Sequence, residues 1–209
     1  MGFFMSNLEN KLKKIVNTFN NIDKNLAYED IKKLSTKYHK NINVLNVLSQ
    51  IAQKMGDVDT TINSLKKILL IDKSNIECIS KIYKLLLSKS LLDEALANIN
   101  LILRIDKDHY EAIRDKAYIY FLKNNFDKAK KNIDNILKLE EKDFFAYNIK
   151  GLIYFKNSNF HEAKNYFEQA IKINSKYVDS YNNLGICLLE LEKLDEAYTV
   201  FKNAYEIES

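Results

Sequence analysis

The amino-acid sequence predicts an all-α protein built from repeated pairs of helices, and three observations support that prediction. Equivalent residues recur every 34 positions along the whole 209-residue chain. Each period contains two apolar stripes at helical spacing, separated by a polar break. Proline is absent and only four glycines occur, so few positions require a sharp non-helical backbone. A fixed period of this length is typical of a repeat architecture.

The period is clearest at a small residue in the second half of each unit. An apolar residue follows this small residue four positions later, on the same face of a predicted helix. The small residues are Ala27, Thr61, Ala95, Ala129, Ala163 and Ala197, and the apolar residues are Ile31, Leu65, Ile99, Ile133, Phe167 and Phe201.

Because the period runs without interruption, we expect residues 1–209 to form a single repeat domain without a linker. Its first unit is degenerate, since Lys11 and Lys14 fall at positions that we expect in the core. In the next unit, Gly56 and Asp57 mark the turn between two helices. The degenerate unit covers 8–41, and the repeat units cover 42–75, 76–109, 110–143, 144–177 and 178–209.

The last two units show the helix pair most clearly. Gly151 and Gly185 hold equivalent places in the first helix of each unit. Since glycine costs about 1 kcal/mol relative to alanine inside a helix, a repeated glycine indicates close approach of the paired second helix. We expect Ala163 and Ala197 to face these glycines. The stripes of the last unit are Tyr181, Leu184, Gly185 and Leu188, then Leu194, Ala197, Phe201, Ala204 and Tyr205.

Three helix starts have the spacing of a capping box, in which a cap side chain and an acid three residues later satisfy free backbone donors. The predicted caps are Ser74, Asp108 and Asn159, followed by Glu77, Glu111 and Glu162.

These motifs resemble the tetratricopeptide repeat, whose pattern joins a Trp-x2-Leu-Gly-x2-Tyr stretch to Ala-x3-Phe, although this chain contains no tryptophan. The proline that ends the family pattern is absent, and Lys107, Glu141 and Ser175 stand in its place. The resemblance implies a right-handed superhelical solenoid of antiparallel helix pairs, with first helices lining a concave groove. The matching stretches are Tyr181-x2-Leu184-Gly185-x2-Leu188 with Ala197-x3-Phe201, and Tyr147-x2-Lys150-Gly151-x2-Tyr154 with Ala163-x3-Phe167.

Composition excludes several classes of partner. The net charge is only +4, the lysines are scattered through the period, and Arg104 and Arg114 are the only arginines. This pattern argues against nucleic-acid binding, which usually uses clustered arginine and lysine. No apolar run is long enough to span a membrane. Cys78 and Cys187 lie far apart, which favours buried, reduced thiols in a cytoplasmic protein.

No catalytic or metal-binding motif is present. His39, His109 and His161 lack the spacing of metal ligands, and phosphate-binding or nucleophile motifs do not occur. We therefore expect a protein that is not an enzyme and that needs no cofactor or metal.

The resemblance places a candidate binding groove in the C-terminal half. Heat-shock chaperone clamps of the family bind a carboxylate through lysine and asparagine, but Glu111 and Asp115 at the matching sites would repel one. We instead expect apolar residues at inward positions, with acids near the helix starts. The alternative is that the apolar residues belong to the core between repeats. The candidate residues are Tyr118, Phe121, Leu122, Phe145, Ile149, Leu152 and Ile186, with Glu111, Asp115 and Asp179.

The sequence thus favours a non-catalytic scaffold that binds a partner protein, as a peptide or helix with apolar anchors and basic residues. Two alternatives stay open: a regulatory or targeting segment of a larger enzyme, and an assembly factor or chaperone of a secretion or pilus system. Leu188, Val200 and Tyr205 would face a missing neighbour at the C-terminal end. We therefore expect self-association through that end or truncation from a longer protein.

Overall fold

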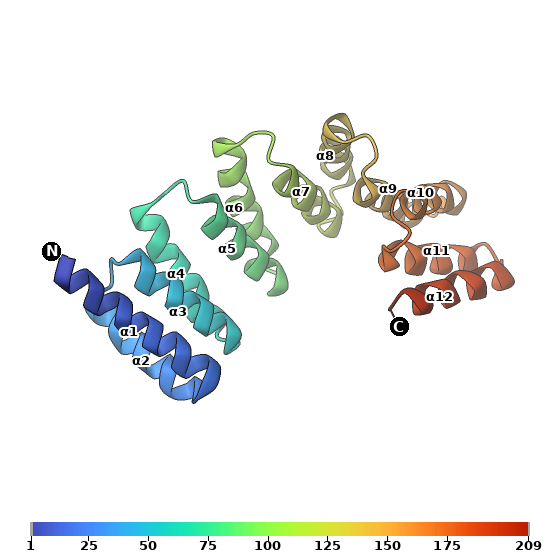
Figure 1. The fold of residues 1–209 in the computed structure, drawn as a ribbon. Helices are drawn as coiled ribbons and strands as arrows, with labels where there is room; N and C mark the ends of the chain where they lie inside the picture. Colours follow the sequence, from blue (N-terminus) through green and yellow to red (C-terminus); the bar gives the residue numbers. More distant parts are fainter. Residues whose placement is uncertain (1, 209) are drawn as a thin grey trace. The chain divides into compact units, whose positions relative to one another are not determined.

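The computed structural model describes residues 2–208, and throughout this range its regular elements are α-helices (Figure 1). Within that range the twelve helices are α1 (Gly2–Asn21), α2 (Lys24–Lys37), α3 (Ile42–Lys54), α4 (Val58–Ile71), α5 (Ile76–Ser88), α6 (Leu92–Ile105), α7 (Tyr110–Leu122), α8 (Phe126–Leu139), α9 (Phe144–Lys156), α10 (Phe160–Ile173), α11 (Val178–Glu190) and α12 (Leu194–Glu208).

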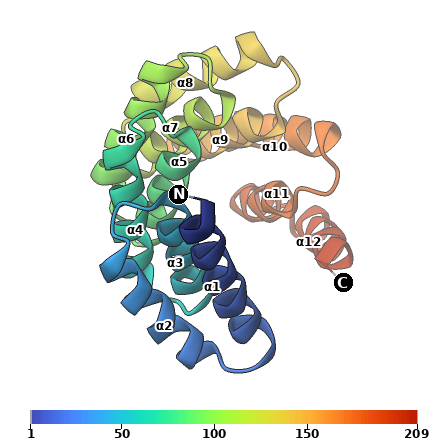
Figure 2. The same ribbon diagram turned by 60° about the vertical axis from the view of Figure 1, so that its left-hand side comes forward.

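Consecutive helices form antiparallel pairs, and the helix starts repeat the sequence period (Figures 1 and 2). From Ile42 onward, the first helix of each pair begins 34 residues after the previous one. The second helices keep the same step from Lys24 to Leu194. The predicted all-α architecture of helix pairs is therefore confirmed.

The chain forms two compact units, one of residues 1–105 and the other of residues 106–209. The N-terminal unit holds the pairs from α1 to α6, and the C-terminal unit holds those from α7 to α12. The single repeat domain over 1–209 stays a prediction.

The first helix pair packs well, in a register that differs from the predicted one. Leu12, Ile15 and Phe19 of α1 are buried, whereas Lys11 and Lys14 are exposed. The three apolar residues share one helical face, so the lysines beside them point to solvent. The expectation that Lys11 and Lys14 occupy the core is therefore wrong.

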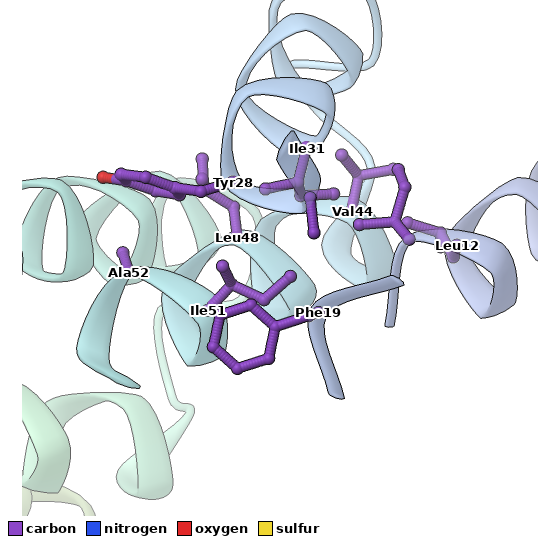
Figure 3. Packing of buried hydrophobic residues seen from close by; sticks show 10 residues of the cluster. Leu12, Phe19, Tyr28, Ile31, Val44, Leu48, Ile51 and Ala52 are labelled. Carbon is purple, nitrogen blue, oxygen red and sulfur yellow. The ribbon is translucent and has the colours of Figure 1, made fainter. Parts of the chain in front are cut away.

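The core of this unit continues from α1 and α2 into α3 (Figure 3). The side chains come together from three helices because each helix buries only one apolar face. The cluster contains Ala27, Tyr28 and Ile31 of α2, and Val44, Leu48, Ile51 and Ala52 of α3.

In the C-terminal unit, Gly151 and Gly185 allow close helix contact, as expected, but the nearest side chains are phenylalanines. A Cβ atom added at Gly151 would lie 2.5 Å from Cε1 of Phe167, and one at Gly185 would lie 2.5 Å from Cε1 of Phe201. The side chains nearest these glycines are thus Phe167 and Phe201, and the expected contacts of Ala163 and Ala197 stay a prediction. The large ring four positions further on fills the space that the missing side chain leaves.

The helix caps at the starts of α5 and α7 lie one residue later than predicted. Asn75 caps α5, because its Oδ1 accepts from the Cys78 backbone N at 3.0 Å. His109 caps α7 in the same way, since its Nδ1 accepts from the Ala112 backbone N at 3.3 Å. Ser74 instead donates its hydroxyl to Asp72. Asn159 does precede α10, but its side chain makes no cap hydrogen bond.

The C-terminal end differs in part from expectation. Leu188 is 1% exposed and belongs to the core with Phe167 and Leu184, so it does not face a missing neighbour. Val200 packs against the same cluster, and Tyr205 is 73% exposed. Self-association through this end stays a prediction.

The turn inside each pair repeats a left-handed backbone residue. From the second pair onward, the residue two positions before the second helix has a positive φ, which only glycine adopts without steric cost. The series is Gly56, Ser90, Asn124, Ser158 and Glu192, with φ values of 78°, 59°, 55°, 58° and 59°.

Replacing Glu192 with glycine should therefore stabilise the protein. We expect the free energy of unfolding to rise by about 0.5–1 kcal/mol, because relief of the left-handed strain exceeds the added entropy cost of glycine. Urea unfolding measures the change, and Gly56→Ala is the control, with an expected loss of about 1 kcal/mol. Equal stability of Glu192→Gly and the wild type would contradict the strain at this turn.

Candidate functional site

A cavity of about 390 Å³ opens among the first helices of the C-terminal unit. The residues that line it come from α7, α9 and α11 and from the residue before α11. They are Tyr118 on α7, Phe145, Asn148, Ile149 and Leu152 on α9, and Tyr177, Asp179, Asn182 and Asn183 at or near the start of α11.

One wall of the cavity is aromatic. The rings of Tyr118 and Phe145 meet edge to face, with centroids 6.1 Å apart and planes at 68°. The guanidinium carbon of Arg114 lies 4.9 Å from the Phe145 ring centroid, in a cation–π contact. These contacts order a wall that carries both apolar surface and a nearby cation.

Another part of the wall is polar and joins α9 to α11. Oδ1 of Asn148 accepts from the Ser180 hydroxyl at 3.1 Å and from Nδ2 of Asn183 at 3.0 Å. Asn148 and Ser180 are buried, so these hydrogen bonds satisfy groups that water does not reach. The network fixes the side chain of Asn183 in the cavity wall.

Tyr177 lines the cavity from the position just before α11. Its ring packs on Phe144, with centroids 4.8 Å apart. Burial, and then the charge of Asp179, raise the pKa of the Tyr177 hydroxyl far above its usual value. The hydroxyl therefore stays protonated and remains a hydrogen-bond donor at all physiological pH values.

The charges around the cavity have mixed signs. Nε of Arg114 lies 3.5 Å from Oδ1 of Asp115. This Nε is buried and makes no hydrogen bond within residues 2–208. Glu111 and Asp179 are exposed, whereas Asp115 is half-buried. Arg114 thus offsets part of the negative charge that the sequence predicts here, and Asp179 is the acid in the cavity wall.

The structure brings five of the ten predicted residues together at this cavity. The other five predicted residues do not line it. Those in the cavity wall are Tyr118, Phe145, Ile149, Leu152 and Asp179, and those outside it are Phe121, Leu122, Ile186, Glu111 and Asp115.

Two of the predicted groove residues belong to the core. Ile149 is 0% exposed and Phe121 is 9% exposed, whereas Leu122 and Ile186 are 41% and 46% exposed. Ile149 forms part of the cavity wall, although its side chain has no solvent-exposed surface. Its side chain is thus a core residue of α9, the alternative that the sequence left open, and its role in binding stays a prediction.

Four residues of the cavity wall were missed by the sequence reasoning. They are Asn148, Tyr177, Asn182 and Asn183. The period itself contains a signal for two of them, since Asn148 and Asn182 lie 34 residues apart. The same position is also polar in earlier units, where it is Asn46, Ser80 and Arg114.

Asp143 positions α9, the helix that supplies most of the cavity wall. Its carboxylate accepts from the backbone N of Ala146 at the start of this helix, and the side chain is 2% exposed. Burial raises the pKa of this carboxyl above its usual value, although the hydrogen bonds from the backbone of Ala146 and Phe145 act in the opposite direction.

Replacing Asp143 with asparagine should stabilise the protein near neutral pH. Because the folded-state pKa is raised, the ionised carboxylate disfavours folding, and the stability of the wild type falls as the pH rises through this pKa. Asparagine keeps the cap oxygen without the charge. We expect the melting temperature to rise by about 2–4 °C at about pH 7, the shift for roughly 1 kcal/mol.

The gain should disappear below about pH 3, where the carboxyl is protonated in both the folded and the unfolded state. Asp57→Asn is the control with the opposite sign. The pKa of Asp57 is lowered, first by a hydrogen bond from the Tyr28 hydroxyl, so that variant should lose stability at neutral pH. A lower melting temperature for Asp143→Asn would show that the charged cap outweighs its burial.

Within residues 2–208, no group of histidine, cysteine, aspartate and glutamate side chains is arranged to hold a metal ion. No helix in this range combines the length and the apolar character that a membrane span needs. Cys78 and Cys187 are both buried and unpaired with each other.

The comparisons agree with the repeat pattern. Two family models of the tetratricopeptide repeat match the sequence, one over residues 144–177 and the other over 166–199. Residues 144–199 therefore match the tetratricopeptide repeat family. A comparison with curated proteins gave no match.

Solved structures of repeat proteins have the same fold. A tetratricopeptide repeat protein from Parabacteroides merdae ATCC 43184 is 20% identical, with a TM-score of 0.79 over 95% of this chain and 78% of that chain. MamA from Desulfovibrio magneticus RS-1 is 16% identical, with a TM-score of 0.65 over 80% of this chain and 94% of that chain. A thermophilic repeat protein of Thermus thermophilus is 16% identical, with a TM-score of 0.57 over 87% of this chain and 98% of that chain.

Proposed function

We propose that this protein is a non-catalytic interaction module that binds a short segment of a partner protein in the cavity of its C-terminal unit. The observation that supports the proposal is the composition of the cavity wall, which joins aromatic and apolar side chains to three asparagines. Ligand sites in proteins typically combine an apolar lining with a few polar groups that fix orientation.

The asparagine side chains suit the backbone of a peptide. Each amide offers both a donor and an acceptor, which match the carbonyl and N–H groups of an extended segment. Asn182 is exposed, and Asn183 is held in place by its hydrogen bond to Asn148. A polar wall of this kind can hold a segment without demanding a particular side chain.

The aromatic wall selects the side chains of the partner. Tyr118 is 36% exposed, and Phe145 and Leu152 are half-buried, so an apolar anchor would gain contact with all three. Asp179 adds a negative charge in the wall, which favours a lysine or arginine beside the anchor. Two buried cysteines without a disulfide agree with a location in the cytoplasm, which is part of the proposal.

Peptides selected from a random library displayed on phage test the proposal. We expect the peptides selected on the whole protein to share an apolar residue close to a lysine or arginine. Fluorescence anisotropy then measures the affinity of a labelled peptide. Tyr118→Ala and Asn182→Ala should each weaken binding by about tenfold, the range of a moderate hot spot, with little change in melting temperature.

Tyr198→Ala is the matched control, because Tyr198 is 73% exposed on α12 and lies outside the cavity wall. This variant should bind the peptide as tightly as the wild type. A library that yields no specific peptide would contradict the proposal, as would a peptide that binds both cavity variants with unchanged affinity.

A further inference from the structure

A second cavity of the C-terminal unit has a basic lining. It measures about 310 Å³ and lies along the antiparallel pair α7 and α8. Three lysines contribute to its wall, together with a phenol and two amides, all of which can donate hydrogen bonds. The residues are Lys116 and Tyr120 on α7, and Lys128, Lys131, Asn132 and Asn135 on α8.

The two helices present these side chains on facing stripes. Lys116 and Tyr120 are four residues apart on α7, so they share one helical face. Nζ of Lys128 lies 5.4 Å from the ring centroid of Tyr120, which places the start of α8 beside the end of α7. Nδ2 of Asn132 donates to the Lys128 carbonyl oxygen at 2.8 Å, which holds this side chain against its own helix.

The three lysines have no counter-ion within the described residues. None of them forms an ion pair between residues 2 and 208. Lys116 is half-buried, and burial together with the charges of Lys128 and Lys131 lowers the pKa of its ammonium group. Three lysine ammonium groups that repel one another therefore surround this second cavity.

The next repeat fills the equivalent space differently. Lys150, which lies 34 residues after Lys116, has Nζ 4.0 Å from Oδ1 of Asp134 and 5.5 Å from the ring centroid of Tyr166. The residue 34 positions before Tyr166 is Asn132. A small amide therefore stands where the next repeat has an aromatic ring, and the space left open is lined by lysines.

We propose that this cavity binds a phosphate group. Three ammonium groups call for an anion with more than one charge, and lysine binds phosphate as a point charge without a fixed approach direction. The Tyr120 hydroxyl and the amides of Asn132 and Asn135 can donate to further phosphate oxygens. This inference does not rest on the peptide-binding cavity, which is lined by different residues.

Nuclear magnetic resonance titration of the whole protein tests the inference at constant ionic strength. The probes are inorganic pyrophosphate, a phosphoserine peptide and its unphosphorylated form. We expect saturable shifts of the backbone amides near Lys116 and Lys131 with one or both phosphate probes. Stronger binding of pyrophosphate assigns the site to a small phosphate compound, and stronger binding of the phosphopeptide assigns it to a phosphorylated protein segment.

Charge-matched variants show whether the cavity itself binds. Lys116→Gln and Lys131→Gln should each weaken binding by at least about tenfold. Lys131 is exposed, so its variant reports on binding even if the Lys116 variant is less stable. Lys138→Gln is the control, because Lys138 is exposed on α8 outside the cavity. Absence of saturable shifts with both phosphate probes would overturn the inference. An equal loss of affinity in the Lys138 control would do so as well.

Discussion

Replacing Phe167 with alanine should lower the free energy of unfolding by about 3–5 kcal/mol, the usual cost of deleting a buried aromatic ring. The ring is fully buried and packs in the core cluster with Ala163, Leu184 and Leu188. It also occupies the space beside Gly151. Urea unfolding followed by circular dichroism measures the loss.

The contact between Phe167 and Gly151 predicts a strong coupling between the two positions. With Phe167 in place, an alanine Cβ at 151 would lie 2.5 Å from the ring, so Gly151→Ala should destabilise the protein. The steric clash costs about 1–3 kcal/mol. The higher helix propensity of alanine relative to glycine offsets about 1 kcal/mol of that cost. In the Phe167→Ala background the clash is gone, and the same change should stabilise the protein by about 1 kcal/mol.

Gly185→Ala is the control for this coupling. The ring that it would meet belongs to Phe201, which is only half-buried and has more room to move. We therefore expect a smaller loss than at Gly151. Additive effects of Gly151→Ala and Phe167→Ala would contradict the close packing of α9 on α10.

Ile149→Asp should unfold the C-terminal unit, with a loss of at least about 4 kcal/mol, because it removes a buried apolar side chain and introduces a buried charge. Ile149 is 0% exposed. Ile149→Asp should therefore abolish peptide binding only because it unfolds the protein. Loss of binding in this variant gives no information on contacts in the groove.

Ile186→Asp is the matched control, since Ile186 is 46% exposed on α11. Its effect on the free energy of unfolding should stay within about 0.5 kcal/mol, as for most surface substitutions. Thermal unfolding of the two variants distinguishes core from surface. A folded Ile149→Asp protein with a melting temperature near that of the wild type would show that the Ile149 side chain reaches solvent.

The architecture could be predicted because the period fixes helix starts independently of any contact. The glycines of the last two units even indicated where helices approach each other. The side chain that packs against each glycine could not be predicted in the same way. Ala163 and Phe167 lie on the same helical face, and the sequence does not show that the larger side chain fills the gap at Gly151.

The sequence pattern does not distinguish between two adjacent residues as the buried residue of the first helix pair or as the cap of a helix. Lys11 and Leu12 are adjacent, so a shift of one position in register exchanges an exposed residue for a buried one. The same holds for Ser74 and Asn75, which are both good cap residues. Only the backbone geometry at the start of α5 selects Asn75.

About half of the residues in the candidate site could be predicted from the sequence. Apolar spacing on α9 identified Phe145, Ile149 and Leu152, but spacing alone cannot tell a cavity wall from a core. The polar wall was missed because its asparagines have no catalytic or metal-binding pattern. Their meaning appears only when α9 and α11 bring Asn148 and Asn183 within hydrogen-bond distance.

Photo-crosslinking tests the central proposal, peptide binding in the cavity of the C-terminal unit, most directly. A photoreactive benzoylphenylalanine in place of Tyr118, on the cavity wall, is compared with the same residue in place of Tyr198 on α12. With a peptide selected on the wild-type protein, we predict a crosslink from position 118 that excess unlabelled peptide removes, and none from position 198. Crosslinking from position 198 alone, or from both positions equally, would contradict binding in this cavity.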